Sequence, residues 1–251
     1  MITPAWKQNM SAAVAVDLEF DGDVILCAAT CWTNGFLFVP QLWCCHGTSG
    51  FVALNDSMLE SLLDSLWQFH ETGAALVTWG GTGCDWPKLL KSANASYHEK
   101  IRTLALASID IPLVSVAANG MMMGLSATAT GMGLGFRASC DSELVPSMWN
   151  SKDAVKQHEV MQHVQWDAWA TVQIYNRLMF QINFARPQIT WVTQRSGPRS
   201  VRLQRERLES GAWTLPTVRS IMDWDAPVAK FQIPEHLHPM KLTQWLRVEN
   251  E

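Results

Sequence analysis

The sequence predicts an α/β fold with a mixed central sheet of about five strands flanked by helices. Near the start of the chain, three short strand-like segments are separated by turn residues, which is typical of an antiparallel meander. Further along, helical patterns alternate with apolar runs, as expected for parallel strands joined by helices. With 251 residues, 48% of them hydrophobic and 17% charged, the chain can bury a large core.

We expect the first strand at residues 13–20, the second at 24–32 and the third at 36–43. Asp21-Gly22-Asp23 and Asn34-Gly35 lie between them and are typical hairpin turns.

A helix is predicted next, capped by Asn55 or Asp56 and running to about His70, with Gly73 ending it. Its apolar residues recur at helical spacing. They are Met58, Leu59, Leu62, Leu63, Leu66 and Phe69.

Residues 74–79 are continuously apolar, which indicates a central parallel strand, and residues 80–83 form a glycine-rich loop. A short helix is expected from Asp85 to about Ala93, with Pro87 in its first turn.

The second half is less regular. We expect a helix at residues 97–108, a fifth strand at 109–116 with Asp110 near its middle, and short helices and loops at 120–135. A long helical pattern, with a break near its middle left open, covers residues 151–186. The glycines of Gly131-x-Gly133-x-Gly135 indicate backbone flexibility, since they lack the context of a dinucleotide fingerprint.

We expect residues 1–186 to form the main domain. Residues 187–251 should form a tail packed on it, with a hairpin at 189–204 that turns at Ser196-Gly197-Pro198.

No apolar run is long enough to cross a bilayer and the first residues do not resemble a signal peptide, so we expect a cytoplasmic protein without membrane contact. The six cysteines lack paired Cys-x-x-Cys knuckles, which favours reduced thiols over zinc. The net charge of −4 argues against binding long duplex DNA by charge alone. The stretch 186–207 nevertheless carries six arginines and one glutamate, which could meet a phosphate backbone.

Two carboxylates end the first strand. Asp17 and Glu19 alternate with apolar residues, so both point to one face. Like charges side by side resist burial unless a cation lies between them, and carboxylate oxygens suit Mg²⁺. Two solvated acids at a strand end are the alternative.

Two further positions offer similar chemistry. Asp85 opens a helix, where it is either an N-cap or a metal ligand. His163 and Asp167 are four residues apart and share a helix face, which is either solvated or catalytic. Together, Asp17, Glu19, Asp85 and Asp167 can bracket two divalent cations, Mg²⁺ or Mn²⁺, and His163 can accept a proton from water.

In order and spacing, these motifs resemble the DEDD superfamily of 3′-to-5′ exonucleases, which have a ribonuclease H-like fold. The resemblance covers roughly residues 10–185: Asp17 and Glu19 match the first motif, Asp85 with Leu89 the second, and His163 with Asp167 the third. It implies a phosphodiester hydrolase using two metal ions.

One departure concerns His163. The tyrosine branch of this superfamily has Tyr four positions before the last Asp, and the histidine branch has His five before it. Here His occupies the tyrosine spacing, and the surrounding residues resemble the tyrosine branch more closely. Three roles therefore stay open for His163: it is the base, it orients water, or it marks a weakened enzyme.

Substrate contacts are expected from aromatic and basic residues. Phe20 follows the first motif, where the family often places a wedge against terminal bases. Trp86 and Trp166 are candidates for base stacking, with core packing as the alternative. The expected phosphate-binding residues, with a solvated basic face as the alternative, are Arg195, Arg199 and Arg202.

The sequence thus predicts an exonuclease acting on single-stranded DNA or RNA ends, since the chain is aromatic-rich and lacks a strongly basic surface. The alternative is a nucleic-acid-binding or scaffold protein that keeps the fold without turnover.

Overall fold

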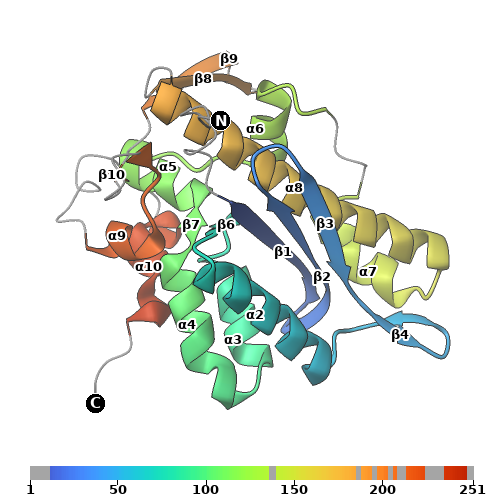
Figure 1. The fold of residues 1–251 in the computed structure, drawn as a ribbon. Coiled ribbons are helices and arrows are strands. Elements are labelled where there is room, and N and C mark those ends of the chain that lie inside the picture. Colours follow the sequence, from blue (N-terminus) through green and yellow to red (C-terminus); the bar gives the residue numbers. More distant parts are fainter. Residues whose placement is uncertain are drawn as a thin grey trace, which may run out of the picture.

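A computed structural model describes residues 12–135, 140–184, 188–193, 197–202, 206–207, 213–223 and 235–247. The fold is α/β, as expected, with a mixed five-stranded sheet in the order β3-β2-β1-β6-β7 (Figure 1). On one side of β1, β2 pairs antiparallel with β1 and β3 pairs antiparallel with β2, whereas on the other side β6 and β7 run parallel to β1. The strands are β1 Ala13–Asp21, β2 Val24–Thr33, β3 Phe38–Trp43, β6 Ala75–Thr78 and β7 Ile109–Asp110.

The antiparallel meander forms where the turn residues predict it. Gly22 adopts φ 59°, which a residue without Cβ does at little cost, between the paired residues Asp21 and Val24. Asn34 Oδ1 accepts hydrogen bonds from the backbone N–H groups of Phe36 and Leu37, at 3.1 and 2.9 Å. These local bonds hold residues 36 and 37 in the turn, so β3 begins two residues later than predicted.

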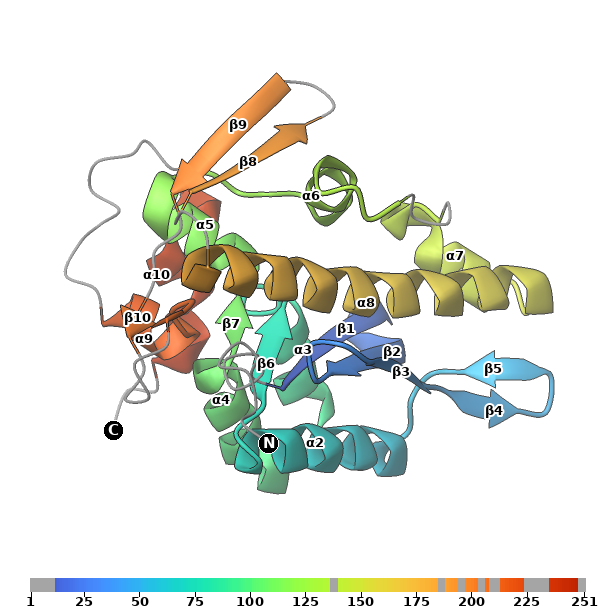
Figure 2. The same cartoon turned by 45° about the horizontal axis from the view of Figure 1, so that its top comes forward.

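Helices cover both faces of the sheet. Figure 2 shows α8 (Ala154–Phe184) along one face, and α2 (Asp56–Glu71) with α4 (His98–Ala107) on the other. Asn55 caps α2 by accepting a hydrogen bond from the Met58 backbone N–H at 2.9 Å. The buried stripe of α2 is Leu59, Leu62, Leu63 and Leu66, each contributing roughly 1.5–3 kcal/mol by burial.

The predicted fifth strand at 109–116 is wrong beyond its first two residues. Strand β7 contains only Ile109 and Asp110, and helix α5 (Ile111–Asn119) follows. The cause is local, because Asp110 caps the helix by accepting a hydrogen bond from the Leu113 N–H, and Pro112 fits its first turn.

The other connections are short helices and a small hairpin. They are β4 Cys45–Gly47, β5 Gly50–Val52, α3 Asp85–Ser92, α6 Leu125–Gly131 and α7 Val145–Asn150, with a 3₁₀ turn at Ala95–Tyr97 before α4 and another at Ser142–Leu144 before α7. The β4–β5 hairpin was not predicted. It is tied to α8 by Gln157, whose amide accepts from the Phe51 N–H and donates to the carbonyls of Phe51 and Trp149. Helix α8 itself is continuous through all 31 residues.

The tail begins with the predicted hairpin, formed by β8 (Gln188–Thr193) and β9 (Gly197–Arg202). Gly197 and Pro198 belong to β9 rather than to the turn, and the turn residues 194–196 lie outside the described part. The later elements are β10 Glu206–Arg207, β11 Trp213–Thr214, α9 Val218–Met222, α10 Pro239–Leu242 and 3₁₀ turns at Glu235–Leu237 and Gln244–Leu246.

Two tail segments are hydrogen-bonded to the earlier part of the chain. The Val218 N–H donates to the Ser108 carbonyl, and Trp245 Nε1 donates to the Thr82 carbonyl, both at 2.8 Å. Among the described residues, no helix combines the length and apolar character that a membrane span requires.

Candidate functional site

Strand β1 contributes two carboxylates to the face covered by α8. Val16 and Leu18 are buried on the opposite face, so the alternation of strand side chains directs Asp17 and Glu19 toward α8. Glu19 is 8% exposed and Asp17 is half-buried. The register of β1 with β2 shifts directly after Glu19, so the strand departs from regular pairing at this residue.

Helix α8 places His163 and Asp167 opposite these carboxylates. His163 is fully buried, and its Nε2 lies 3.0 Å from Glu19 Oε1 and 3.5 Å from Asp167 Oδ2. One potential ligand atom from each of these three residues lies within 4.8 Å of the others. The structure thus joins the first and third sequence motifs into one buried cluster.

The position of His163 gives it two possible chemical roles. A protonated Nε2 donates to the two carboxylates and holds them in place, whereas a deprotonated Nε2 offers a lone pair to a cation. Sequence reasoning assigned His163 to proton transfer and did not include it among the metal ligands. The distance of 3.0 Å between His163 Nε2 and Glu19 Oε1 is the observation that adds His163 to the candidate metal ligands.

Helix α3 brings Asp85 to the same place. The N-cap position of α3 is Cys84, and Asp85 is the first helical residue, so the N-cap alternative for Asp85 is wrong. Asp85 is 5% exposed. Burial, followed by the carboxylates of Asp110 and Asp167, raises the pKa of Asp85 from 3.8 to about 8. Asp85 therefore lies within electrostatic reach of Asp167, although its ligand atoms are not part of the three-residue cluster.

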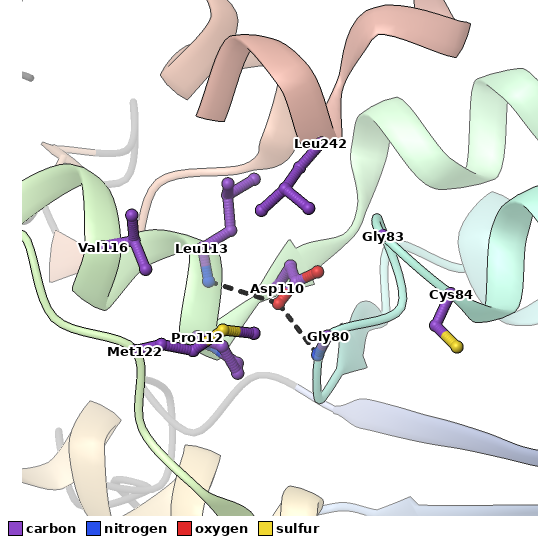
Figure 3. A pocket seen from close by; sticks show the side chains of 9 residues that line it. All are labelled: Gly80, Gly83, Cys84, Asp110, Pro112, Leu113, Val116, Met122 and Leu242. Carbon is purple, nitrogen blue, oxygen red and sulfur yellow. Dashed lines mark hydrogen bonds between the residues drawn. The ribbon is translucent and has the colours of Figure 1, made fainter. Parts of the chain in front are cut away.

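Sequence reasoning missed Asp110, a carboxylate that is 1% exposed. It accepts hydrogen bonds from the backbone N–H groups of Gly80 at 3.0 Å, Thr82 at 2.8 Å and Leu113 at 3.3 Å, two of which Figure 3 shows. Burial raises the pKa of Asp110, and these hydrogen bonds lower it in part. Asp110 thereby fixes the loop that leads into Asp85. An Asp two residues before Pro112 was the available sequence signal for this cap.

The raised pKa values of two thiols reflect the negative charge of the nearby carboxylates. Burial, followed by Glu19 and Asp17, raises the pKa of the Cys27 thiol well above its ordinary value. Cys84 is exposed as a residue, but desolvation, followed by the Asp85 carboxylate, raises the pKa of its thiol to about 12. Both thiols stay protonated at neutral pH, so neither is a nucleophile.

The donor set suits a divalent cation. Glu19, His163 and Asp167 provide two carboxylates and an imidazole, a mixture that suits Mn²⁺, with Mg²⁺ preferring the carboxylates. The raised pKa of Asp85 shows that its charge is costly in the metal-free site, and a bound cation would relieve that cost. The residues present therefore fit the cofactor that the sequence predicts, at least for one ion.

The aromatic residues predicted to contact the substrate differ in their burial. Trp86 is fully buried, so its predicted stacking on a base is wrong and the alternative of core packing holds. Phe20 is half-buried, with Lys88 Nζ 5.1 Å from its ring centroid. Trp166 is half-buried and lies 6.5 Å from the ring of Trp169. The contacts of Phe20 and Trp166 with substrate remain predictions.

The predicted phosphate-binding arginines cannot be placed against the site. Arg195 and the side chains of Arg199 and Arg202 lie outside the described part of the chain.

Comparison of the chain with models of known protein families and with curated proteins gave no match.

Proposed function

We propose that this protein is a metal-dependent 3′-to-5′ exonuclease of the DEDD type, which hydrolyses phosphodiester bonds at single-stranded DNA or RNA ends. The observation that carries the proposal is the convergence of Glu19, His163 and Asp167 within 4.8 Å. These residues come from a strand and a helix far apart in sequence, in the order and spacing of the DEDD motifs.

The sheet order supports the proposed ribonuclease H-like fold. In β3-β2-β1-β6-β7 the first strand is central, with an antiparallel pair on one side and parallel strands on the other. This is the arrangement that the resemblance implies, including a late helix facing the carboxylates of the first strand.

Each residue has a role in this proposal. Asp17, Glu19, Asp85 and Asp167 would hold two divalent cations, which would supply an activated water and stabilise the leaving oxygen. With its Nε2 deprotonated, His163 is the candidate proton acceptor beside Glu19 and Asp167. Asp85 must lose its proton when a cation binds, so occupancy should increase with pH.

A gel assay tests the proposal. 5′-labelled single-stranded DNA and RNA of equal sequence are incubated with Mn²⁺, Mg²⁺ or EDTA. We expect shortening from the 3′ end that is lost in EDTA and in Asp17→Asn. Asp56→Asn, which alters an exposed carboxylate of α2 on the other side of the sheet, is the matched control and should remain active. Activity in Asp17→Asn equal to that of the wild type would refute the assignment.

The contacts of His163 favour one second candidate, a nucleic-acid-binding or scaffold protein without turnover. A protonated His163 can offset one of the two negative charges of Glu19 and Asp167 from within the protein, which lessens the need for a cation. Thermal unfolding separates the two candidates. Stabilisation by Mn²⁺ that Asp56→Asn retains and Asp17→Asn loses supports the enzyme. Binding of an intact oligonucleotide without any metal effect supports the scaffold.

A further inference from the structure

Two residues of the tail contact the loop that leads into Asp85. Trp245 Nε1 donates a hydrogen bond to the Thr82 carbonyl at 2.8 Å, across 163 positions of the chain. Leu242 of α10 packs against the same loop. A Cβ added at Gly83 would lie 2.9 Å from Leu242 Cδ2, which is closer than such contacts occur, so glycine is what allows this approach. The tail and the loop are therefore closely fitted to each other.

The loop is also held by Asp110. The Thr82 N–H donates to Asp110 Oδ2 at 2.8 Å, and the Gly80 N–H donates to Asp110 Oδ1 at 3.0 Å. Both backbone groups of Thr82 are thus bonded to residues distant in sequence, the N–H to Asp110 and the carbonyl to Trp245. Figure 3 shows Asp110 and Leu242 meeting the loop from two different elements, β7 and α10. The loop is therefore fixed in place from outside itself.

The position of the loop sets the start of α3. The Gly81 carbonyl accepts hydrogen bonds from the Cys84 N–H at 3.3 Å and from the Trp86 N–H at 2.9 Å. Asp85 lies between these two residues and is the first residue of α3. Because the loop and the first turn of the helix are bonded together, a displacement at Thr82 would also displace Asp85.

The position of Asp85 matters for cation binding. The candidate cluster consists of Glu19, His163 and Asp167, and Asp85 is not among them. Its side chain is 5% exposed, so it has little room to adjust. Ligand distances at a metal ion are defined to within about 0.2 Å. Whether the Asp85 carboxylate can join a cation at the cluster therefore depends on where the loop places the start of α3.

We propose that Trp245 and Leu242 are positioning residues for Asp85, and that docking of the tail on loop 80–84 sets the cation affinity of the site. The inference rests on the proposed metal site and adds a dependence on the tail to it. The coupling is reciprocal, so a cation bound through Asp85 also strengthens the docking of the tail.

Mn²⁺ binding tests the inference, since the electron paramagnetic resonance signal of free Mn²⁺ reports the Kd in a titration. Trp245→Phe keeps an aromatic ring and removes the N–H donor. We expect it to raise the Kd about ten-fold, as loss of an outer contact that orients a metal ligand does. Leu242→Ala should also raise the Kd. Met240→Ala is the matched control and should keep the wild-type Kd, because Met240 is an exposed residue of the same helix.

The same substitution in Asp85→Asn separates positioning from a general structural effect. In that background the carboxylate that Trp245 positions is absent, so Trp245→Phe should change the Kd little further. An equal rise of the Kd in both backgrounds, or a wild-type Kd in Trp245→Phe, overturns the inference and leaves the metal site standing. Absence of Mn²⁺ binding in the wild type refutes the metal site and the inference with it.

Hydrogen exchange in EDTA tests the contact without a cation. Trp245→Phe should increase exchange at the Cys84 and Trp86 amides, whose acceptor is the Gly81 carbonyl. The Leu59 amide of α2 is the internal control and should exchange as in the wild type. Wild-type exchange at Cys84 and Trp86 would mean that Trp245 does not hold the loop, which overturns the inference whatever the Kd values are.

Discussion

Replacing Asp85 with asparagine should stabilise the metal-free protein at alkaline pH while weakening its response to Mn²⁺. The carboxyl of Asp85 is buried next to Asp110 and Asp167, which raises its pKa from 3.8 to about 8. A raised pKa means that the folded state binds the proton more tightly than the unfolded state does. The resulting penalty is absent below about pH 4 and grows as the pH rises toward 8, where the folded protein must either retain the proton or bury a charge.

The magnitude follows from the two pKa values. Each pH unit between them costs ~1.4 kcal/mol, so the three units from pH 5 to pH 8 cost about 4 kcal/mol. Asparagine has nearly the same shape and does not ionise, so Asp85→Asn avoids this cost. The difference in unfolding free energy between variant and wild type should therefore grow by about 4 kcal/mol over that range.

Urea unfolding in EDTA at pH 5, 6, 7 and 8 measures this difference. Asp56→Asn is the control, because it makes the same substitution at an exposed carboxylate of α2, on the other side of the sheet from the candidate site. Added Mn²⁺ should stabilise the wild type most at pH 8 and should stabilise Asp85→Asn less than the wild type at that pH. A difference between Asp85→Asn and wild type that stays constant from pH 5 to pH 8 would refute the argument that Asp85 is destabilised by its carboxylate neighbours.

Three further predictions follow from single contacts. Asp110→Ala should lower the free energy of unfolding by about 3–5 kcal/mol, because two buried N–H groups and one part-buried N–H group lose their acceptor. Asp110→Asn, which keeps one oxygen, should lose less, and equal losses in urea would contradict this role. Gln157→Ala should lower the free energy of unfolding by about 2–3 kcal/mol, since the Gln157 side chain makes three hydrogen bonds to backbone groups. Hydrogen exchange should increase at the Phe51 amide, and unchanged exchange there would be evidence that Gln157 does not hold the β4–β5 hairpin. His163→Ala should reduce the cleavage rate at least about 100-fold while the protein stays folded by circular dichroism, and a rate equal to the wild type would exclude His163 as the base.

The sequence predicts those parts of the fold whose signals are local. Asn55 caps α2, Gly22 turns the first hairpin, and the alternation around Asp17 and Glu19 gives their shared face, because neighbours along the chain decide each of these features. The candidate cluster followed from the order of the motifs, and the structure brings Glu19, His163 and Asp167 together as that order requires.

What the sequence did not predict depends on distant partners. Asp110 looked like part of an apolar strand, and its role emerges only where it meets the backbone of loop 80–83. Trp86 and Trp166 are both tryptophans beside an Asp, but the first is fully buried and the second is half-buried. Nothing in their immediate neighbours distinguishes the two. Gln157, an ordinary polar residue in a helical pattern, is fully buried because the β4–β5 hairpin packs against it.

The link between Glu19 and His163 also bears on how the protein is made. The two residues are 144 positions apart (163 − 19), and β1 and the middle of α8 meet only when the intervening chain has folded between them. Contacts across such separations are among the slowest to form, because closing a long loop carries an entropic cost before it yields any stabilisation. During synthesis, the first strand is therefore made long before α8, and the contact between Glu19 and His163 can form only after α8 follows. Acquisition of cation affinity during refolding would then mark the docking of α8 and report a late folding step.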